Sequence, residues 1–337
     1  MKYPKFIKKG DKIAVTAPSL GFVQEEQLQE YDNAIKNIEN MGYRFTETMN
    51  VRKCKKGRSS SAKERTEQFM KVWKDEDVSA IVCAKGGDFA CEILDELDWD
   101  TLKILEPKWL QGFSDITNLG FVFTTNLDIA TIYGENFRDY GMKEPFKNLT
   151  DSFELMQGKE IVQESFGAYE PTDNERKIFE SYNLCKKINW KNLNGEEKVQ
   201  FSGRCIGGCF DVIVNLIGTK YDKVKEYIKT YKNDGIIWFF DIYEMSTPQV
   251  FCHLWQMKNA GYFEHCKGII FGRTIYLRED YELSLTDVVK DALQNFDVPV
   301  ILDADIGHVP PQMPIVNGSI LNVTCENGKG KIQTFFK

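Results

Sequence analysis

The sequence predicts an α/β protein with two domains, each built around its own sheet. Short, nearly all-apolar runs alternate with longer segments of helical period, and buried parallel strands have this apolar composition. Most of these runs end in a glycine, serine or aspartate turn, which is typical of a strand that leads into a helix. A polar, irregular stretch interrupts the alternation once. We therefore expect a first domain over residues 1–145, a crossover over 146–198 and a second domain over 199–337.

Composition excludes several classes of function. The 337 residues carry a net charge of −7 and no long basic run, which argues against a nucleic-acid partner. The N-terminus lacks the apolar core of a signal peptide, and no segment approaches the roughly 18 apolar residues of a membrane span. The nine cysteines form no Cys-x-x-Cys pair, so we expect reduced, mostly buried thiols, such as Cys83 in its apolar run and Cys91 in a helix. These features favour a cytoplasmic protein.

The first half of the chain contains five predicted strands and their connecting helices. The strands are expected over residues 12–18, 43–48, 78–84, 108–112 and 128–133. The helices are expected over residues 25–41, 61–75, 89–97 and 116–123. Ser61 and Glu64 have the spacing of a capping box, which marks the beginning of the second helix.

Three turns should lie side by side at the carboxyl edge of this sheet. They are residues 85–88, 112–115 and 134–136, each directly after a strand. In open α/β sheets, ligands bind at that edge. Gly86 and Gly87 allow backbone amides to approach an anion closely, although a simple tight turn explains the same pair.

Ser114 is the candidate nucleophile. It lies between an apolar strand and a helical pattern, where a hydroxyl is exposed and the amides of the next turn can hold an oxyanion. The alternative is that Ser114 is only an N-cap, with Asp115 favourable to the helix dipole. The choice depends on whether the rest of the chain supplies a base.

The second half repeats the alternation of strands and helices. A glycine-rich turn over 203–208 leads into a helix, but it lacks the Gly-x-Gly-x-x-Gly spacing, so we expect no dinucleotide cofactor. Further strands are expected over residues 234–240, 268–272 and 298–302, with a hairpin of strands over 319–325 and 331–335. Further helices are expected over residues 210–217, 248–260 and 284–294.

The three histidines differ in their surroundings. His253 lies in a helical pattern and His265 in a polar connection, where a histidine is usually structural or solvated. His308 follows Gly307 after a strand, a place where chemistry is commonly built. Asp241 directly follows the strand 234–240 and provides an acid able to orient an imidazole. No spacing of histidine, cysteine and acidic residues predicts a metal site.

These motifs resemble the LD-carboxypeptidase family of serine peptidases, which includes muramoyltetrapeptide carboxypeptidases and microcin C immunity peptidases. The resemblance runs in order from about residue 4 to 335. The segments that carry it are Ala84-Lys-Gly-Gly87, Gly112-Phe-Ser-Asp-Ile-Thr117, Gly203-Arg-Cys-Ile-Gly-Gly208, the strand into Asp241, Ile269-Ile-Phe-Gly-Arg273 and Asp305-Ile-Gly-His308. It implies a Rossmann-like first domain, a second domain with its own sheet, and a cytoplasmic homodimer.

The resemblance also implies the site residues. Ser114 would be the nucleophile and His308 the base, and the amides of Gly87 and Asp115 would hold the oxyanion. Asp241 stands where the family generally has glutamate, so Glu244 is an alternative acid. Because aspartate is one methylene shorter, its loop must come closer or a water must bridge.

Arg273 is a candidate clamp for a substrate carboxylate, with a structural ion pair as the alternative. Gly86 and Glu244 are further candidates for substrate binding.

Three functions remain open on the sequence alone. The first is release of the terminal D-alanine from a murein tetrapeptide. The second is an immunity-type amidase that cleaves peptidyl or aminoacyl adenylate conjugates. The third is a non-catalytic binder of small anionic peptides or nucleotides that uses the same glycine-rich edge. For the two enzymatic functions the partner is a small peptide or peptide-conjugate substrate.

Overall fold

The computed structural model describes residues 1–171 and 176–337, and the chain divides into two compact units. The first unit extends beyond the predicted boundary at 145 and also takes a short segment near the C-terminus. The first unit comprises Met1–Lys159, Glu175–Tyr182 and Pro314–Asn317. The second comprises Glu160–Asn174, Asn183–Met313 and Gly318–Lys337.

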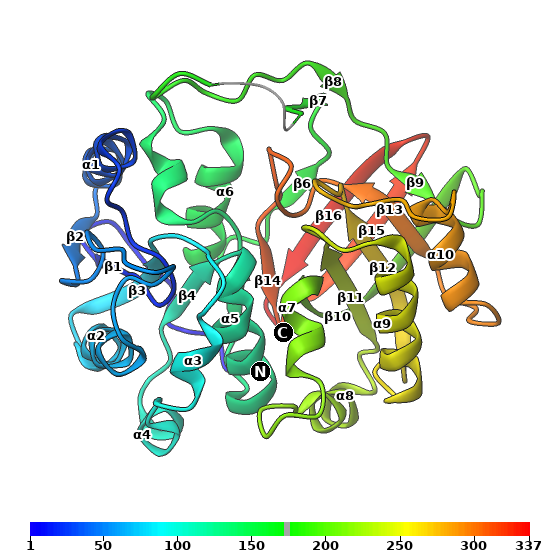
Figure 1. The fold of residues 1–337 in the computed structure, drawn as a ribbon, viewed down its shortest axis with the longest axis horizontal. Helices are drawn as coiled ribbons and strands as arrows, with labels where there is room; N and C mark the ends of the chain where they lie inside the picture. The colour runs from blue at the N-terminus through cyan, green and yellow to red at the C-terminus, as the bar shows by residue number, and fades with distance from the viewer. Residues whose placement is uncertain (172–175) are drawn as a thin grey trace. The chain divides into compact units, whose positions relative to one another are not determined.

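A six-stranded sheet forms the centre of the first unit (Figure 1), in the order β14-β5-β4-β3-β1-β2. All neighbours are parallel except β14, which pairs antiparallel with β5. The strands are β1 (Lys12–Thr16), β2 (Arg44–Glu47), β3 (Val78–Cys83), β4 (Trp109–Gly112), β5 (Thr131–Tyr133) and β14 (Ile315–Asn317). Every residue of β4 and nearly every residue of β1 and β3 is buried, as apolar parallel strands require.

Helices cover both faces of this sheet, with α1 and α6 on one side and α2 and α5 on the other (Figure 1). The predicted capping box of Ser61 and Glu64 begins α2. The helical segments are α1 (Glu25–Asn40), α2 (Ala62–Lys74), α3 (Cys91–Leu94), α4 (Trp99–Ile104), η1 (Ser114–Ile116), α5 (Thr117–Leu127), η2 (Phe137–Gly141) and α6 (Lys147–Met156). This is the Rossmann-like arrangement that the resemblance implied.

Two elements of the first unit are shorter than predicted by three residues or more. The strand expected over 128–133 begins only at Thr131, because Asp128 caps α5 in the left-handed conformation with φ 61°. The helix expected over 89–97 is the four-residue α3. Both differences lie at element ends, where local capping decides the boundary.

An eight-stranded mixed sheet forms the centre of the second unit, in the order β6-β16-β15-β10-β11-β12-β13-β9. The strands β10 to β13 are parallel, and the flanking strands are antiparallel. The strands are β6 (Val162–Glu164), β9 (Lys191–Asn192), β10 (Lys198–Cys209), β11 (Ile236–Asp241), β12 (Cys266–Gly272), β13 (Val300–Ala304), β15 (Ile320–Glu326) and β16 (Lys329–Phe335). The predicted hairpin is the pair β15 and β16. A separate ladder joins β7 (Ala168–Tyr169) to β8 (Lys186–Lys187).

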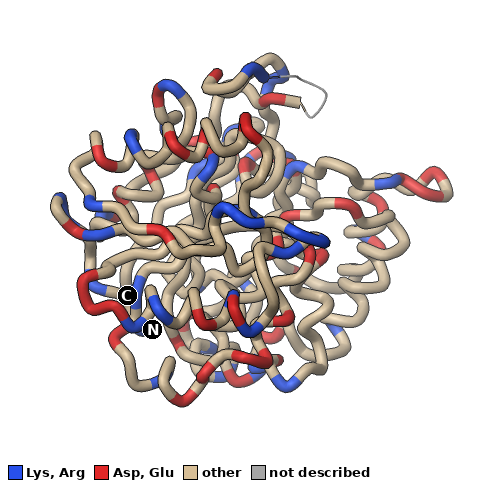
Figure 2. The backbone as a smooth tube through the Cα atoms, turned by 60° about the vertical axis from the view of Figure 1, so that its left-hand side comes forward, with Lys and Arg blue, Asp and Glu red and all other residues tan. Residues whose placement is uncertain are grey.

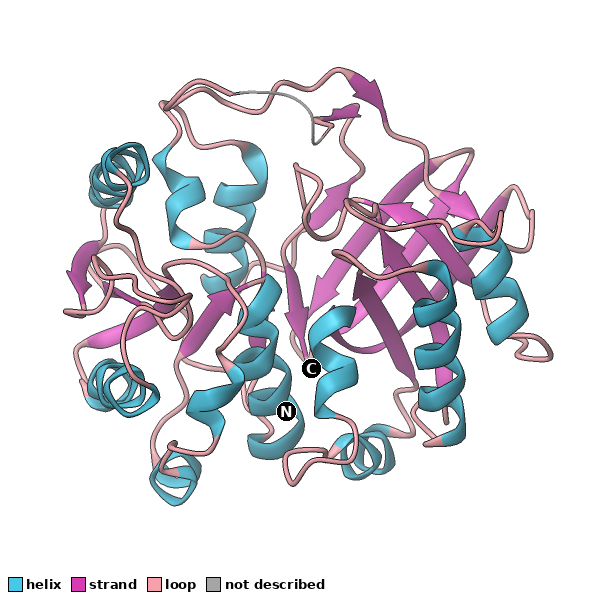
Figure 3. Ribbon diagram, in the orientation of Figure 1, coloured by secondary structure: helices cyan, strands magenta, loops and turns pink. Residues whose placement is uncertain are grey.

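The connections between the parallel strands supply the helices of this unit (Figure 3). Because β10 to β13 follow one another in one direction, right-handed crossovers place their helices on one face of the sheet. The helices are α7 (Phe210–Leu216), α8 (Val224–Tyr231), α9 (Thr247–Asn259) and α10 (Leu285–Ala292).

The glycine-rich segment 203–208 is a strand and not the predicted turn. Strand β10 continues to Cys209, and α7 begins at the next residue. A Cβ at Gly207 would collide with the carbonyl oxygen of Phe239 in β11, so glycine is needed here for the close approach of the neighbouring strand.

Charged residues of both signs are interspersed along the chain (Figure 2). In the described part of the chain, no helix is long and apolar enough to cross a membrane. All nine cysteines are free thiols, but Cys91, Cys185 and Cys252 are exposed, which corrects the expectation for Cys91. Cys83 is buried as predicted.

Candidate active site

The three predicted turns do meet at the carboxyl edge of the first sheet. They follow β3, β4 and β5, which are neighbours. A Cβ at Gly86 would lie 3.0 Å from the Cβ and 3.2 Å from the Oγ of Ser114, so this glycine packs directly against the serine. The amide of Phe113 donates a hydrogen bond of 3.3 Å to Oδ1 of Asn136. The sequence-based expectation for this edge is confirmed.

Ser114 has a strained backbone. Its φ is 62°, in the left-handed region that residues other than glycine rarely occupy. It begins the 3₁₀ turn η1 between β4 and α5, and the cap positions of η1 and α5 are Phe113 and Ile116. The N-cap alternative for Ser114 therefore does not hold. A serine in a strained strand-to-helix turn is the arrangement that exposes a nucleophilic hydroxyl above a sheet.

Asp115 holds the neighbouring loops together, a role that sequence reasoning missed. Its buried carboxylate accepts hydrogen bonds from the hydroxyl of Ser19, the amide of Ala90 (2.8 Å) and Nδ2 of Asn118 (2.9 Å). Burial raises the pKa of Asp115, and these donors oppose the rise. The carboxylate thus connects the loop after β1, the loop after β3 and the start of α5.

Gly87 requires the conformational freedom of glycine. Its φ is 153°, and a Cβ would collide with the hydroxyl of Ser19 and approach Cγ of Leu20 to 2.7 Å. The loop therefore fits tightly beside Ser114 with its backbone uncovered by a side chain.

Asp241 and His308 are joined by two hydrogen bonds in the second unit. Nδ1 of His308 lies 2.6 Å from Oδ2 of Asp241, and the His308 amide donates to Oδ1 at 3.2 Å. Asp241 is fully buried at the end of β11, and the ring of Tyr243 packs on the imidazole with 4.5 Å between centroids. Because a carboxylate only accepts, Nδ1 carries the proton, and Nε2 of the neutral ring is the basic nitrogen.

Glu244 does not take this role in the structure. Its side chain is exposed, and the carboxylate bonded to His308 belongs to Asp241. The amides of Tyr243 and Glu244 donate to the carboxylate of Asp211 at 2.9 and 3.1 Å. Asp211 therefore fixes the loop that follows Asp241, and nothing in the sequence pattern pointed to it.

Arg273 forms the ion pair that was the alternative to a substrate clamp. Its side chain is buried, and Nη1 pairs with the carboxylate of Asp305, which also accepts from the indole of Trp190 at 3.0 Å. Nη2 donates to the carbonyls of Val309 and Pro311 at 3.0 Å each. Arg273 thus stabilises the loop that carries His308 through these hydrogen bonds.

The other histidines lie apart from this chemistry. His253 is in α9 with Nδ1 3.3 Å from Oε1 of Gln256, and His265 precedes β12 with φ 57°. Across residues 1–171 and 176–337, no group of three or more His, Cys, Asp and Glu side chains is arranged to hold a metal ion.

The candidate residues are divided between the two units. Ser114, Gly86, Gly87 and Asp115 belong to the first unit. Asp241, Glu244, Arg273 and His308 belong to the second. Ser114 is ordered by contacts within the first unit, and His308 by contacts within the second.

Comparisons with known proteins match both units. The family model of the LD-carboxypeptidase N-terminal domain matches residues 13–134. The family model of the LD-carboxypeptidase C-terminal domain matches residues 202–323. A Bacillus subtilis protein named "Probable murein peptide carboxypeptidase" is 22% identical over 94% of this chain and 89% of its own. The microcin C7 self-immunity protein of Escherichia coli is 26% identical over 80% of this chain and 78% of its own.

A solved structure shares the fold. The MccF-like protein from Bacillus anthracis has a TM-score of 0.82 at 22% identity, with all of both chains covered. Together the two domain matches span most of the chain, in the order that the sequence motifs predicted. The chain belongs to the LD-carboxypeptidase family of serine peptidases.

Proposed function

We propose that this protein hydrolyses an amide bond at the C-terminus of a small peptide, with Ser114 as nucleophile, His308 as base and Asp241 as orienting acid. The observation that carries the proposal is the left-handed backbone of Ser114 in a tight strand-to-helix turn. A strained conformation of this kind persists only when the surrounding structure holds it, and such residues cluster at active sites.

The reaction follows from the roles of these groups. Nε2 of His308 takes the proton of the Ser114 hydroxyl as Oγ attacks the carbonyl carbon, and the amides of Gly87 and Asp115 stabilise the oxyanion. His308 then returns the proton to the leaving amine, which departs and leaves an acyl-enzyme. Water, activated by the same imidazole, releases the acid and restores Ser114. Asp241 keeps the ring in the required tautomer and stabilises the imidazolium.

The first candidate substrate is a murein tetrapeptide that loses its terminal D-alanine. The relative named as a murein peptide carboxypeptidase supports this choice. The second candidate is a peptidyl or aminoacyl adenylate conjugate, supported by the microcin C7 self-immunity relative and by its solved complex with aspartyl sulfamoyl adenosine. We further propose a cytoplasmic homodimer that acts in peptidoglycan recycling, and light scattering of the purified protein tests the oligomeric state.

The decisive experiment combines covalent labelling with turnover. A serine-reactive fluorophosphonate should label Ser114, and Ser114→Ala should lose both the label and the turnover of murein tetrapeptide or aminoacyl sulfamoyl adenosine. The expected loss is at least about a thousandfold. The control is Ser60→Ala, a half-buried serine on another loop of the same unit, which should label and turn over as wild type does.

Two outcomes would contradict the proposal. If Ser114→Ala kept more than about a tenth of the wild-type rate, the serine mechanism would be excluded. If wild type formed no adduct and turned over neither substrate, the protein would be a non-catalytic binder.

A further inference from the structure

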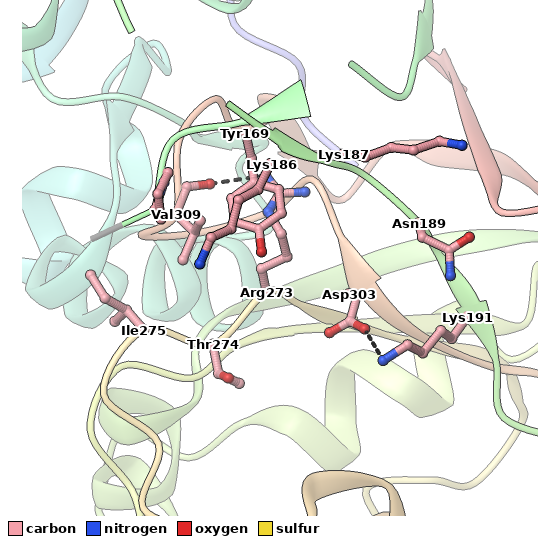
Figure 4. A pocket seen from close by; sticks show the side chains of 11 residues that line it. Tyr169, Lys186, Lys187, Asn189, Lys191, Arg273, Thr274, Ile275, Asp303 and Val309 are labelled. Atoms are coloured by element: carbon pink, nitrogen blue, oxygen red, sulfur yellow. Dashed lines mark hydrogen bonds and ion pairs between the residues drawn. The ribbon is translucent and has the colours of Figure 1, made fainter. Parts of the chain in front are cut away.

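A basic cavity lies in the second unit, beside the loop that carries His308 (Figure 4). Its volume is about 450 Å³. Side chains from the β7–β8 ladder, the end of β12 and the end of β13 line it. Among them are Tyr169, Lys186, Lys191, Arg273, Asp303 and Val309.

Lys186 gives this cavity an uncompensated positive charge. Lys191 pairs with Asp303 at 2.7 Å, so their two charges offset each other. In the part of the chain that the structure describes, no carboxylate pairs with Lys186, whose side chain extends over the cavity (Figure 4). An ammonium held over a concave surface attracts an anion more strongly than one on an open surface.

Arg273 provides a second feature that points to a ligand. Its side chain is 6% exposed, and its Nε has no hydrogen-bond partner among the described residues. The guanidinium carbon lies 5.0 Å from the centroid of the Tyr169 ring, which also lines the cavity. A buried donor without a partner is costly, and an anionic acceptor bound in the cavity would satisfy it.

The cavity borders the loop that carries the proposed base. Val309 lines it and directly follows His308, and the carbonyl of Val309 accepts a hydrogen bond from Nη2 of Arg273. A group bound here therefore contacts the residue that directly follows His308 in the chain. Such a position suits the part of a substrate that extends from the scissile bond.

We propose that this cavity binds an oxyanion of the substrate, a carboxylate or a phosphate, through Lys186 and the donors around Arg273. The role of this cavity in the reaction rests on the proposed function, but the binding of an anion does not rest on it. A carboxylate would come from a peptide, and a phosphate from a nucleotide conjugate. Both offer the acceptor oxygens that ammonium and guanidinium groups recognise.

The chain offers a matched pair of variants for the test. Lys186 and Lys187 both line the cavity from β8, so neither serves as the control for the other. Lys329 on β16 is an exposed lysine of the same unit and is not among the residues that line the cavity. Lys186→Ala and Lys329→Ala thus remove the same charge from the same unit, and only the first removes it from the cavity.

The measurement is calorimetric binding to the full chain of two anions and their neutral counterparts. The phosphate arm compares AMP with adenosine, and the carboxylate arm compares N-acetyl-D-alanine with its amide. We expect one anion to bind more tightly than its neutral counterpart, and Lys186→Ala to raise its Kd about tenfold, as loss of one charge-assisted contact predicts. Lys329→Ala should change that Kd less than about twofold.

Each result is informative. Lys186 dependence confined to AMP identifies a phosphate, and dependence confined to N-acetyl-D-alanine identifies a carboxylate. Equal effects of the two lysine variants, or no preference for either anion, would overturn the cavity as a site. Because these probes are not hydrolysed in the assay, turnover of Ser114→Ala tests the catalytic proposal separately.

Discussion

The short acid Asp241 contacts His308 directly. The carboxylate accepts hydrogen bonds from Nδ1 and from the backbone amide of His308. Because Oδ2 and Nδ1 lie 2.6 Å apart, no water needs to bridge them. Gly307, with φ 93°, packs so closely that a Cβ there would collide with the Asp241 carboxylate. Asp241 and His308 are therefore in direct contact, which agrees with the first of the two solutions expected from the sequence, a close approach without a bridging water.

This geometry predicts the effects of changing the acid. Asp241→Asn should lower kcat by about 10⁴, because the amide presents the wrong hydrogen-bonding partner to His308. Glu244→Gln is the control and should cost far less, because its side chain is exposed. Asp241→Glu should also lose most activity, since the backbone of Gly307 fills the space that another methylene needs. Steady-state kinetics with circular dichroism spectra separates these losses from misfolding.

The opposite pattern would change the assignment. A crippled Glu244→Gln with a nearly silent Asp241→Asn would move the acid to Glu244. Wild-type rates in Asp241→Glu would show that the loop still has room for the longer side chain.

At the scale of one element, the turn from β4 into α5 stores strain that a substitution can release. Alanine at 114 keeps the unfavourable left-handed φ, whereas glycine adopts that φ without a steric penalty. The free energy of unfolding of Ser114→Gly should therefore be about 1 kcal/mol larger than that of Ser114→Ala. Both variants lack the nucleophile. Urea denaturation of the two variants measures this difference.

The control for this prediction is an exposed helical position with an ordinary φ. Lys36 lies on the outer side of α1, where glycine should be less stable than alanine by about 1 kcal/mol. The sign of the glycine–alanine difference should thus reverse between positions 36 and 114. The same sign at both positions would contradict strain at Ser114.

The elements also show what the sequence could and could not predict. The Ser114 turn was predictable because an apolar run, a glycine and a helical pattern follow one another in a few residues. The contacts of Asp115 with Ser19 and Ala90 were not, because they join residues far apart in the chain. The glycines at 203–208 were misread because close strand packing and tight turns both require glycine, and only the neighbouring strand distinguishes them.

At the scale of the whole molecule, the predicted boundaries and the observed units differ near the C-terminus. Strand β14 comes from residues 315–317 yet pairs with β5 of the first unit. A three-residue strand carries almost no periodic signal, so its partner is set by tertiary contacts. The order of the other parallel strands follows from short right-handed connections, which is why the fold class was predictable.

Metal independence is the prediction that concerns the whole chain. His253, His265 and His308 lie on separate elements, and the described residues bring no three His, Cys, Asp or Glu side chains together as ligands. The proposed chemistry is instead carried by Ser114, His308 and Asp241. Exhaustive treatment with a chelator should therefore leave kcat unchanged within about a factor of two. It should also leave Tm unchanged. Loss of activity that zinc restores, with Ser114→Ala inactive in either state, would mean that a metal assists this serine. Loss that zinc restores equally in Ser114→Ala would instead replace the serine mechanism with metal-activated water.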